Sequence, residues 1–366
     1  MAYTTIDKPT DYFDTKLHTG TGLSKTLAFD FEVDFLWTKM RNDAYSQGIY
    51  DSSRGNNSQL RANVNNSERG AANTVSFGNS SGVTLGSDSS SYGVNQENTD
   101  GGSAANYVAW AWKANGGTTT TNDASSTGVG SVDSVYQVNS TAKFGLMTYT
   151  ATGSGNITVA HGMGSAPKFL ITKVRDQNFD WFVWHHTLAN THGLGLNTTN
   201  ASADSSDALG DTSPSSTVFT MGNGGNANNN YQAGDDIICY YFDEVQGYSK
   251  FGSYTGNGTS SSADFDGPFV YTGFKPAWIM TKRSSTSNGS WAIVDNKRDT
   301  ANPTQIALFA NTTGSDDTDK KVDFLSNGFK LRNSRDDFNT DGVTYIYIAF
   351  AEHPFVSSKG VPVTAK

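Results

Sequence analysis

The sequence predicts an all-β protein built from three tandem antiparallel β-sandwich domains of the jelly-roll or lectin-like kind. Three observations support this. A short motif rich in aromatic and β-branched residues occurs three times along the 366 residues. Turn-forming residues recur about every 8 to 12 positions between short apolar runs, a spacing typical of sandwiches. Gly, Ser, Thr and Asn are abundant and rank low in helix propensity, and the apolar residues show no helical period.

The repeated motif predicts a β-hairpin, in which an apolar strand ending in lysine is followed by turn formers and a second strand. Its copies are 34–41 with 48–51, 167–175 with 181–184, and 276–283 with 291–295. In the first copy, Phe35, Trp37 and Lys39 share one face and Leu36 lies on the other. Apolar residues on both faces predict a central strand whose lysine reaches the rim. Asp34 stands where the pattern expects proline, so we expect the strand to begin differently there.

These copies divide the chain into six segments. We expect an N-terminal arm at 1–11, sandwich repeats at 12–113, 143–247 and 248–354, a linker at 114–142, and a C-terminal tail at 355–366. The linker is rich in Gly, Thr, Ser and Asn, which favours a flexible or extended connection. Within it, residues 134–139 alternate like an edge strand.

Each repeat closes on an apolar strand, at 107–113, 236–244 and 345–352. In the first of these, Tyr107, Ala109 and Ala111 face one side and Val108, Trp110 and Trp112 face the other. Such a strand is buried on both sides or covered by a neighbouring repeat. All seven tryptophans fall in the hairpins or closing strands, so we expect the tryptophans to pack rather than to catalyse.

Composition excludes several classes of function. The net charge is −9 and basic residues form no run, which argues against a nucleic-acid surface. The single cysteine, Cys239, lies in an apolar run and is expected to be buried, so no disulfide can form within the chain. The N-terminus lacks an apolar signal segment and no stretch approaches membrane-spanning length. We therefore expect a soluble protein made in the cytoplasm.

Two short patterns resemble functional motifs. Residues 78–82 match the letters of a G-x-S-x-G nucleophile elbow, but they align with Ser326–Phe329 of the third repeat and are expected to form a turn. Residues 337–342 match the first half of a calcium loop near the acidic cluster 316–319, but Ile348 stands at the twelfth position instead of glutamate. The same Asn-Thr-Asp-Gly occurs at 98–101, so a turn is favoured for both.

The histidines are the remaining candidates. His185, His186 and His192 could bind a metal, but alternation along a strand places His185 and His186 on opposite faces, and a rim position beside Trp184 is favoured over zinc. A histidine next to a tryptophan could also stack on a sugar ring. No pair of carboxylates shares a strand beside an aromatic cleft, so a glycosidase is unsupported. We assign no catalytic residue, metal ligand or cofactor.

Several motifs resemble those of virion structural proteins of marine, cyanophage-like tailed bacteriophages. They are Met1–Pro9 with Asp11–Phe13, Tyr107–Lys113, Ser134–Asn139, His161–Pro167 and Tyr254–Gly258. The resemblance covers nearly the whole chain. It implies a virion protein of the tail-fibre or general structural type, and it brings no catalytic residues.

We therefore predict a non-enzymatic virion protein, a tail fibre or surface appendage that contributes to host attachment. Exposed Ser/Asn/Gly loops such as 193–230 are candidate contact surfaces, host glycans are possible ligands, and other virion proteins are expected partners. Closed symmetric assembly predicts a homotrimer. Within the virion, a head decoration protein is the alternative. From another class, a glycan-binding lectin or a glycan depolymerase is the alternative.

Overall fold

The computed structural model describes residues 3–88, 92–205, 208–223, 229–259 and 266–363, and its regular structure is almost entirely antiparallel β-strand. The first unit has a large and a small sheet. In order across the large sheet lie β1 (Phe13–Thr19), β9 (Asn106–Trp112), β3 (Phe35–Met40), β4 (Gly48–Asp51), β5 (Ser58–Arg61) and β6 (Arg69–Gly70). The small sheet holds β2 (Lys25–Ala28), β8 (Gly82–Leu85) and β7 (Val75–Asn79).

The second unit repeats this order and extends it. Across its large sheet lie β10 (Thr120–Asn122), β11 (Ser134–Asn139), β12 (Phe144–Thr150), β19 (Asp236–Phe242), β14 (Phe169–Val174), β15 (Phe182–His185), β16 (His192–Gly195) and β17 (Ala203–Asp204). Its small sheet pairs β13 (Ile157–Ala160) with β18 (Val218–Met221). The short helix α1 (Ala124–Thr127) lies between β10 and β11.

The third unit has the same core order. Its large sheet contains β20 (Ser249–Thr255), β27 (Thr344–Pro354), β22 (Phe274–Arg283), β23 (Ala292–Asp295) and β24 (Leu308–Phe309), and its small sheet contains β21 (Phe269–Tyr271), β26 (Gly328–Leu331) and β25 (Val322–Leu325). In every unit the closing strand therefore lies between the first strand and the hairpin. The all-β fold and the threefold repeat of its strand order are confirmed.

Each unit has its own core between its two sheets. Leu36, Leu170 and Ile279 occupy equivalent places on the hairpin strands, and each lies in the separate core of its unit. The opposite face of the same strands, with Phe35, Phe169 and Trp278, does not face solvent. Alternation along the hairpin strand is thus confirmed, and both faces are buried as predicted.

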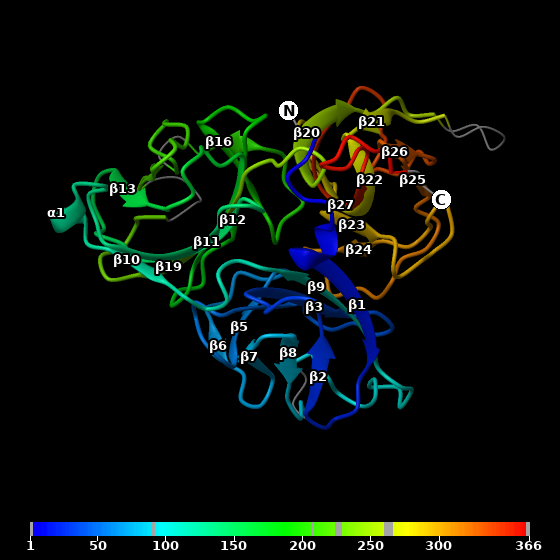
Figure 1. The fold of residues 1–366 in the computed structure, drawn as a ribbon, viewed down its shortest axis with the longest axis horizontal. Helices are drawn as coiled ribbons and strands as arrows, with labels where there is room; N and C mark the ends of the chain where they lie inside the picture. The colour runs from blue at the N-terminus through cyan, green and yellow to red at the C-terminus, as the bar shows by residue number, and fades with distance from the viewer. Residues whose placement is uncertain (1–2, 89–91, 206–207, 224–228, 260–265, 364–366) are drawn as a thin grey trace.

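The three large sheets share one central core, so the units do not stand in a row. Figure 1 shows three lobes meeting at the middle of the molecule. The equivalent closing-strand residues Trp112, Phe242 and Phe350 touch one another there, with ring centroids 5.6 to 6.4 Å apart. The closing strand was expected to be buried on both sides or covered by a neighbouring repeat; both hold, since its two faces lie in different cores and the other repeats cover one of them. The chain closes on itself with approximate threefold symmetry.

The expected linker at 114–142 is wrong as a flexible segment. Its β11 pairs with β12 along five register positions, from Val135↔Thr148 to Asn139↔Phe144, and β10 lies outside β11. The segment therefore belongs to the sheet of the second unit. Its start is fixed by the buried Asp34 carboxylate, which accepts hydrogen bonds from the backbone N–H of Ala114 at 2.7 Å and of Gly117 at 2.7 Å.

Two further expectations about the hairpin need correction. Val33, not Asp34, stands at the position of Pro167 and Pro276, because each lies six residues before the repeated lysine. The lysines do not reach solvent: Lys39, Lys173 and Lys282 are at most 1% exposed. Their ammonium groups donate instead to backbone carbonyls of nearby loops, such as Asp43 for Lys39 at 3.2 Å.

Described residues near the two ends of the chain contact each other and the third unit. The expected arm at 1–11 is not a free tether over its described part, since Ile6 is buried in the central core and η1 (Pro9–Asp11) leads directly into β1. Asp7 Oδ1 accepts the backbone N–H of Ser358, in the expected tail at 355–366, at 2.6 Å. Both ends thus help to close the ring of units.

Candidate functional site

The polar side chains with the most distinctive chemistry lie in three seams between the units. We call them the 1–2, 2–3 and 3–1 seams after the units they join. Three sets of equivalent repeat positions make the contacts at each seam, and the 2–3 seam fills two of these sets with different chemistry. The position of each contact residue is therefore given relative to the hairpin strands of its unit.

The first contact uses the residue just before the second hairpin strand. Trp181 Nε1 donates to Arg61 O at 2.9 Å across the 1–2 seam, and Trp291 Nε1 donates to Gly195 O at 2.8 Å across the 2–3 seam. Gln47 makes the equivalent bond to Phe309 O across the 3–1 seam. The three acceptors occupy equivalent positions, because each one pairs with the first residue of the second hairpin strand of its own unit.

The second contact uses the residue that pairs with the start of the hairpin strand: Asp51, His185 or Asp295. Asp51 Oδ2 accepts the hydroxyl of Tyr240 at 2.6 Å, and Asp295 Oδ2 accepts Trp110 Nε1 at 3.1 Å. The third member is different. His185 Nε2 lies 3.2 Å from the carbonyl oxygen of Tyr347, because the equivalent of Tyr240 and Trp110 is Ile348, which has no polar side chain.

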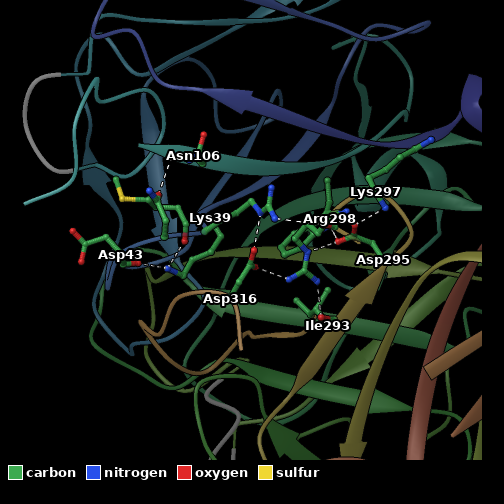
Figure 2. Close-up of polar contacts among 12 residues, drawn as sticks. Lys39, Asp43, Asn106, Ile293, Asp295, Lys297, Arg298 and Asp316 are labelled. Atoms are coloured by element: carbon green, nitrogen blue, oxygen red, sulfur yellow. Dashed lines mark hydrogen bonds and ion pairs between the residues drawn. The ribbon is translucent and has the colours of Figure 1, made fainter. Parts of the chain in front are cut away.

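The third contact is a chain of ion pairs that crosses a seam. Across the 3–1 seam, Arg298 binds Asp295 at 2.6 Å and Asp316 at 3.0 Å, and Asp316 also binds Arg41 of the first unit at 2.8 Å. Figure 2 shows Arg298 between the carboxylates of Asp295 and Asp316, with Lys39 and its loop nearby. The guanidinium also donates to Ile293 O at 2.7 Å.

The 1–2 seam repeats this arrangement. Arg54 binds Asp51 and, at 2.8 Å, Glu68, and Glu68 binds Arg175 of the second unit at 3.0 Å. The side chains of Arg54 and Asp51 are fully buried, as are those of Arg298 and Asp295. Each buried charge thus has an opposite charge and further hydrogen bonds, which is the condition for an ion pair to be tolerated inside a protein.

The 2–3 seam has a neutral set at the same positions. Leu188, Ser202 and Ser284 replace the buried arginine, the acid and the outer arginine. In the charged seams the acid also donates a backbone bond to the outer arginine, from Glu68 N to Arg175 O and from Asp316 N to Arg41 O at 2.7 Å. The neutral seam keeps this backbone bond, from Ser202 N to Ser284 O at 2.9 Å. Lys282 adds a bond across this seam, to Asn200 O at 2.8 Å. Only backbone carbonyls accept from its ammonium group in the bonds recorded among the described residues.

Burial and neighbours set the charge states in the seams. Burial alone would raise the pKa of Asp295, but Arg298 lowers it below its usual value. Burial alone would lower the pKa of Arg298, but Asp295 and Asp316 raise it. In the neutral seam, burial lowers the pKa of His185 to about 3, so this imidazole stays neutral. Burial also lowers the pKa of Lys282 to about 8.

The histidine hypotheses change with the structure. His185 is buried at the 2–3 seam, so the rim position expected for it is wrong, and Trp184 is too buried to stack on a sugar. The rings of His185 and His186 stack at 5.0 Å, contrary to the expectation of opposite faces. His192 Nδ1 contacts Thr191 Oγ1 at 2.9 Å. Over the described ranges, no group of three or more His, Cys, Asp or Glu side chains is placed to hold a metal.

The other sequence motifs are turns or core residues. Residues 78–82 form the β7–β8 turn, in which Asn79 pairs with Gly82, as predicted. In the loop 337–342, Asp337 Oδ1 accepts Ser290 N at 2.7 Å and Asn339 Oδ1 accepts Asn257 N at 2.8 Å, so these oxygens hold the loop itself. Cys239 is buried in the core of the second unit, as predicted.

Two surface hollows lie near polar side chains. The loop region 193–230 contains a small cavity of about 60 Å³ beside Asp180 and Gly195, while its residues 206–207 and 224–228 lie outside the described part of the chain. A larger hollow of about 450 Å³ is lined by Asp30, Glu32 and Lys113. Its Asp30 bonds Lys8 at 2.8 Å, which lowers the pKa of Asp30, whereas a general acid needs a raised pKa.

Sequence reasoning missed the seams because their partners lie far apart along the chain. One signal was present: Asp51 and Asp295 follow equivalent hairpins, and Arg54 and Arg298 each come three residues later. A motif of aspartate and arginine at the end of an apolar strand indicates a buried pair, since neither charge could be buried alone.

Comparison with known proteins matches most of the chain to one family. Among the described residues no helix is long and apolar enough to cross a membrane. No curated protein and no solved structure matches the chain. A family model described as "Domain of unknown function (DUF7483)" matches residues 8–354, which span all three units. The chain therefore belongs to the DUF7483 family.

Proposed function

We propose that this chain is a non-enzymatic structural protein of a bacteriophage virion, a tail fibre or surface appendage that contributes to host attachment. The observation that carries the proposal is the placement of buried charges. Asp51 binds Arg54 at the 1–2 seam, and Asp295 binds Arg298 at the 3–1 seam. All four side chains are fully buried, so no substrate can reach them. Side chains so placed serve assembly. The motifs that resemble phage virion proteins supply the biological setting.

A ring of three units suits an appendage in physical terms. The two chain ends are held on the third unit and the central core joins all three, so no unit hangs on a flexible linker. A stiff particle transmits force and displays its surface loops in fixed positions. Many weak contacts, multiplied by copy number, then give avidity without a tight site. The expected homotrimer stays part of the proposal and is checked by sedimentation equilibrium.

The head decoration alternative is favoured by one observation, the approximate threefold symmetry. The equivalent residues Trp112, Phe242 and Phe350 meet at the centre of the molecule. A single chain could therefore make three similar contacts with a threefold site on a shell. A lectin or depolymerase outside the virion remains the competing class, and a depolymerase additionally needs two carboxylates about 5 to 9.5 Å apart in an open groove.

Labelling of intact particles tests the proposal. Gold-conjugated antibodies against the purified chain should decorate the tails of the phage that encodes it, seen by electron microscopy. Decoration of the head would favour the shell alternative. Particles that carry no label, and contain no trace of the chain by mass spectrometry, would contradict a virion role.

A further inference from the structure

A row of exposed aromatic side chains lies on the third unit. Phe269 and Tyr271 are 45% and 56% exposed, although both lie on strand β21. Val270 between them is 6% exposed and points into the core of the unit. Alternation along the strand therefore holds both aromatic rings on the outer face of the small sheet.

The chain ends extend this row. The hydroxyl of Tyr3 donates to Gly273 O at 2.6 Å, and the ring of Tyr3 lies 6.5 Å from that of Phe355, which is 36% exposed. Gly273 permits this approach, since a Cβ there would lie 2.9 Å from the Tyr3 hydroxyl and 3.5 Å from the Tyr271 hydroxyl. We call Tyr3, Phe269, Tyr271 and Phe355 the aromatic row.

The other two units show that the fold does not need these rings. Val270 pairs with Phe329, as Leu27 pairs with Val83 and Val159 pairs with Phe219. By this register the residues equivalent to Phe269 and Tyr271 are Thr26 and Ala28 in the first unit, and Thr158 and Ala160 in the second. Aromatic residues at two exposed positions, where the repeats have small ones, indicate a role in binding.

The charges beside the row are already paired. Lys330, which is opposite Phe269 in the sheet, binds Asp266, and Arg332 binds Asp323 at 2.5 Å. These described pairs leave no excess of positive charge of their own for a nucleic acid or another polyanion. The row therefore suits a ligand with little net charge where it meets the rings.

The size of the row argues against a protein partner. A Phe or Tyr side chain buries about 150–250 Å² when fully covered, so the half-exposed rings of Phe269 and Tyr271 offer roughly 100 Å² each. A stable protein interface needs about 800 Å² on each partner. A sugar ring fits the row better, because its C–H face can pack on the negative face of an aromatic ring while its hydroxyls bond polar groups such as the tyrosine hydroxyls.

We propose that the aromatic row of the third unit is a carbohydrate-binding platform for surface polysaccharide. It deepens the proposed attachment function and rests on it for the source of the polysaccharide. Each platform binds weakly, because it is flat and made of few rings. Binding to a cell surface then depends on many copies.

The test is a microarray of purified bacterial lipopolysaccharides and capsular polysaccharides, probed with the full-length chain. We expect at least one polysaccharide to bind the wild type, and its apparent affinity to fall about tenfold or more in the double variant F269T/Y271A. This variant installs the residues of the first unit, so its melting temperature should match the wild type. Y231A, which removes another exposed tyrosine, is the matched control and should bind normally.

Three outcomes would overturn the platform: no binding to any polysaccharide, equal binding by the double variant, or self-association of the wild type that the double variant abolishes in sedimentation velocity. The last would make the row an interface between copies. Particle labelling separates this test from the proposed function. A labelled virion with no polysaccharide binding overturns only the platform, and binding by a chain absent from particles overturns only the virion role.

Discussion

The 3–1 seam and the 2–3 seam solve the same packing problem with opposite chemistry. At the 3–1 seam, Asp295 and Arg298 are buried as ions and continue through Asp316 to the neighbouring unit. At the 2–3 seam, His185 and Leu188 stand at the same positions without a charge. Both seams keep the tryptophan or glutamine bond to the next unit and the backbone bond beside it. The threefold arrangement thus depends on shape and backbone bonding.

The buried charges make the stability of a seam depend on both members of each ion pair. A buried ion pair contributes little net stability, because desolvation offsets the attraction, but loss of one partner is costly. The charged seams should therefore tolerate substitution poorly, and the neutral seam should tolerate it well. Chain connectivity does not set this division, because the 1–2 seam is charged although its two units follow each other directly in sequence.

The largest expected effect comes from R298M. The variant leaves Asp295 buried without its opposite charge, so we expect the free energy of unfolding to fall by about 3–5 kcal/mol. L188M at the equivalent position of the neutral seam is the matched control and should change it by less than about 1.5 kcal/mol, because the volume is conserved. Urea unfolding followed by tryptophan fluorescence measures both. Equal losses in the two variants would erase the distinction between the seams.

A cleaner substitution is Y240F, which removes only the hydroxyl that donates to Asp51. A hydrogen bond to a charged group contributes about 1.5–3 kcal/mol, so we expect a loss in that range from the 1–2 seam. I348V changes the equivalent residue of the 2–3 seam by one methylene and should cost about 0.5–1.5 kcal/mol. If Y240F were as stable as the wild type, Asp51 would not depend on this donor.

Acid should weaken the neutral seam before the charged ones. Burial lowers the pKa of His185 from 6.5 to about 3, so between these values the unfolded chain binds a proton that the folded chain does not. Stability is therefore complete above pH 6.5 and falls as the pH is lowered, by about 2 kcal/mol at pH 5 for this one group. The lowered pKa of Asp295 acts only below its unfolded value of 3.8.

The variant H185Q isolates this effect. The stability of H185Q should depend less on pH between 7 and 5 than that of the wild type, by the same 2 kcal/mol or so. His18 and His161, whose pKa values burial lowers to about 4, should give the same residual slope in both proteins. Urea unfolding at several pH values makes the comparison. Parallel curves for the two proteins would mean that His185 does not control acid stability.

The elements of this fold were readable from the sequence, but their assembly was not. Alternation placed Leu36 and Phe35 on opposite faces of one strand, and both faces proved to be buried. The period of a strand says which face a residue takes, but it does not say what covers that face. In the segment 114–142 alternation predicted the strand at 134–139, which is β11, but composition made the segment a linker because the pairing of β11 with β10 and β12 is not visible in a local pattern. The seams involve pairs such as Arg175 and Glu68, which are too far apart in sequence for local patterns to join them.

The smallest expected effect lies at the outer end of the charged seams, where Arg41 binds Asp316 but is partly exposed. R41Q keeps most of the side-chain volume and leaves Asp316 bound to Arg298, so the loss should be about 1 kcal/mol or less. Because salt screens exposed charges more than buried ones, this loss should shrink between 0.05 and 1 M NaCl on the scale of the Debye length. S284A, at the equivalent position of the 2–3 seam, should show no salt dependence, because no charge is removed. If the loss in R41Q did not change with salt, the Arg41–Asp316 pair would behave as a buried contact. The expectation that ion pairs contribute less stability at the edge of the seam than inside it would then be wrong.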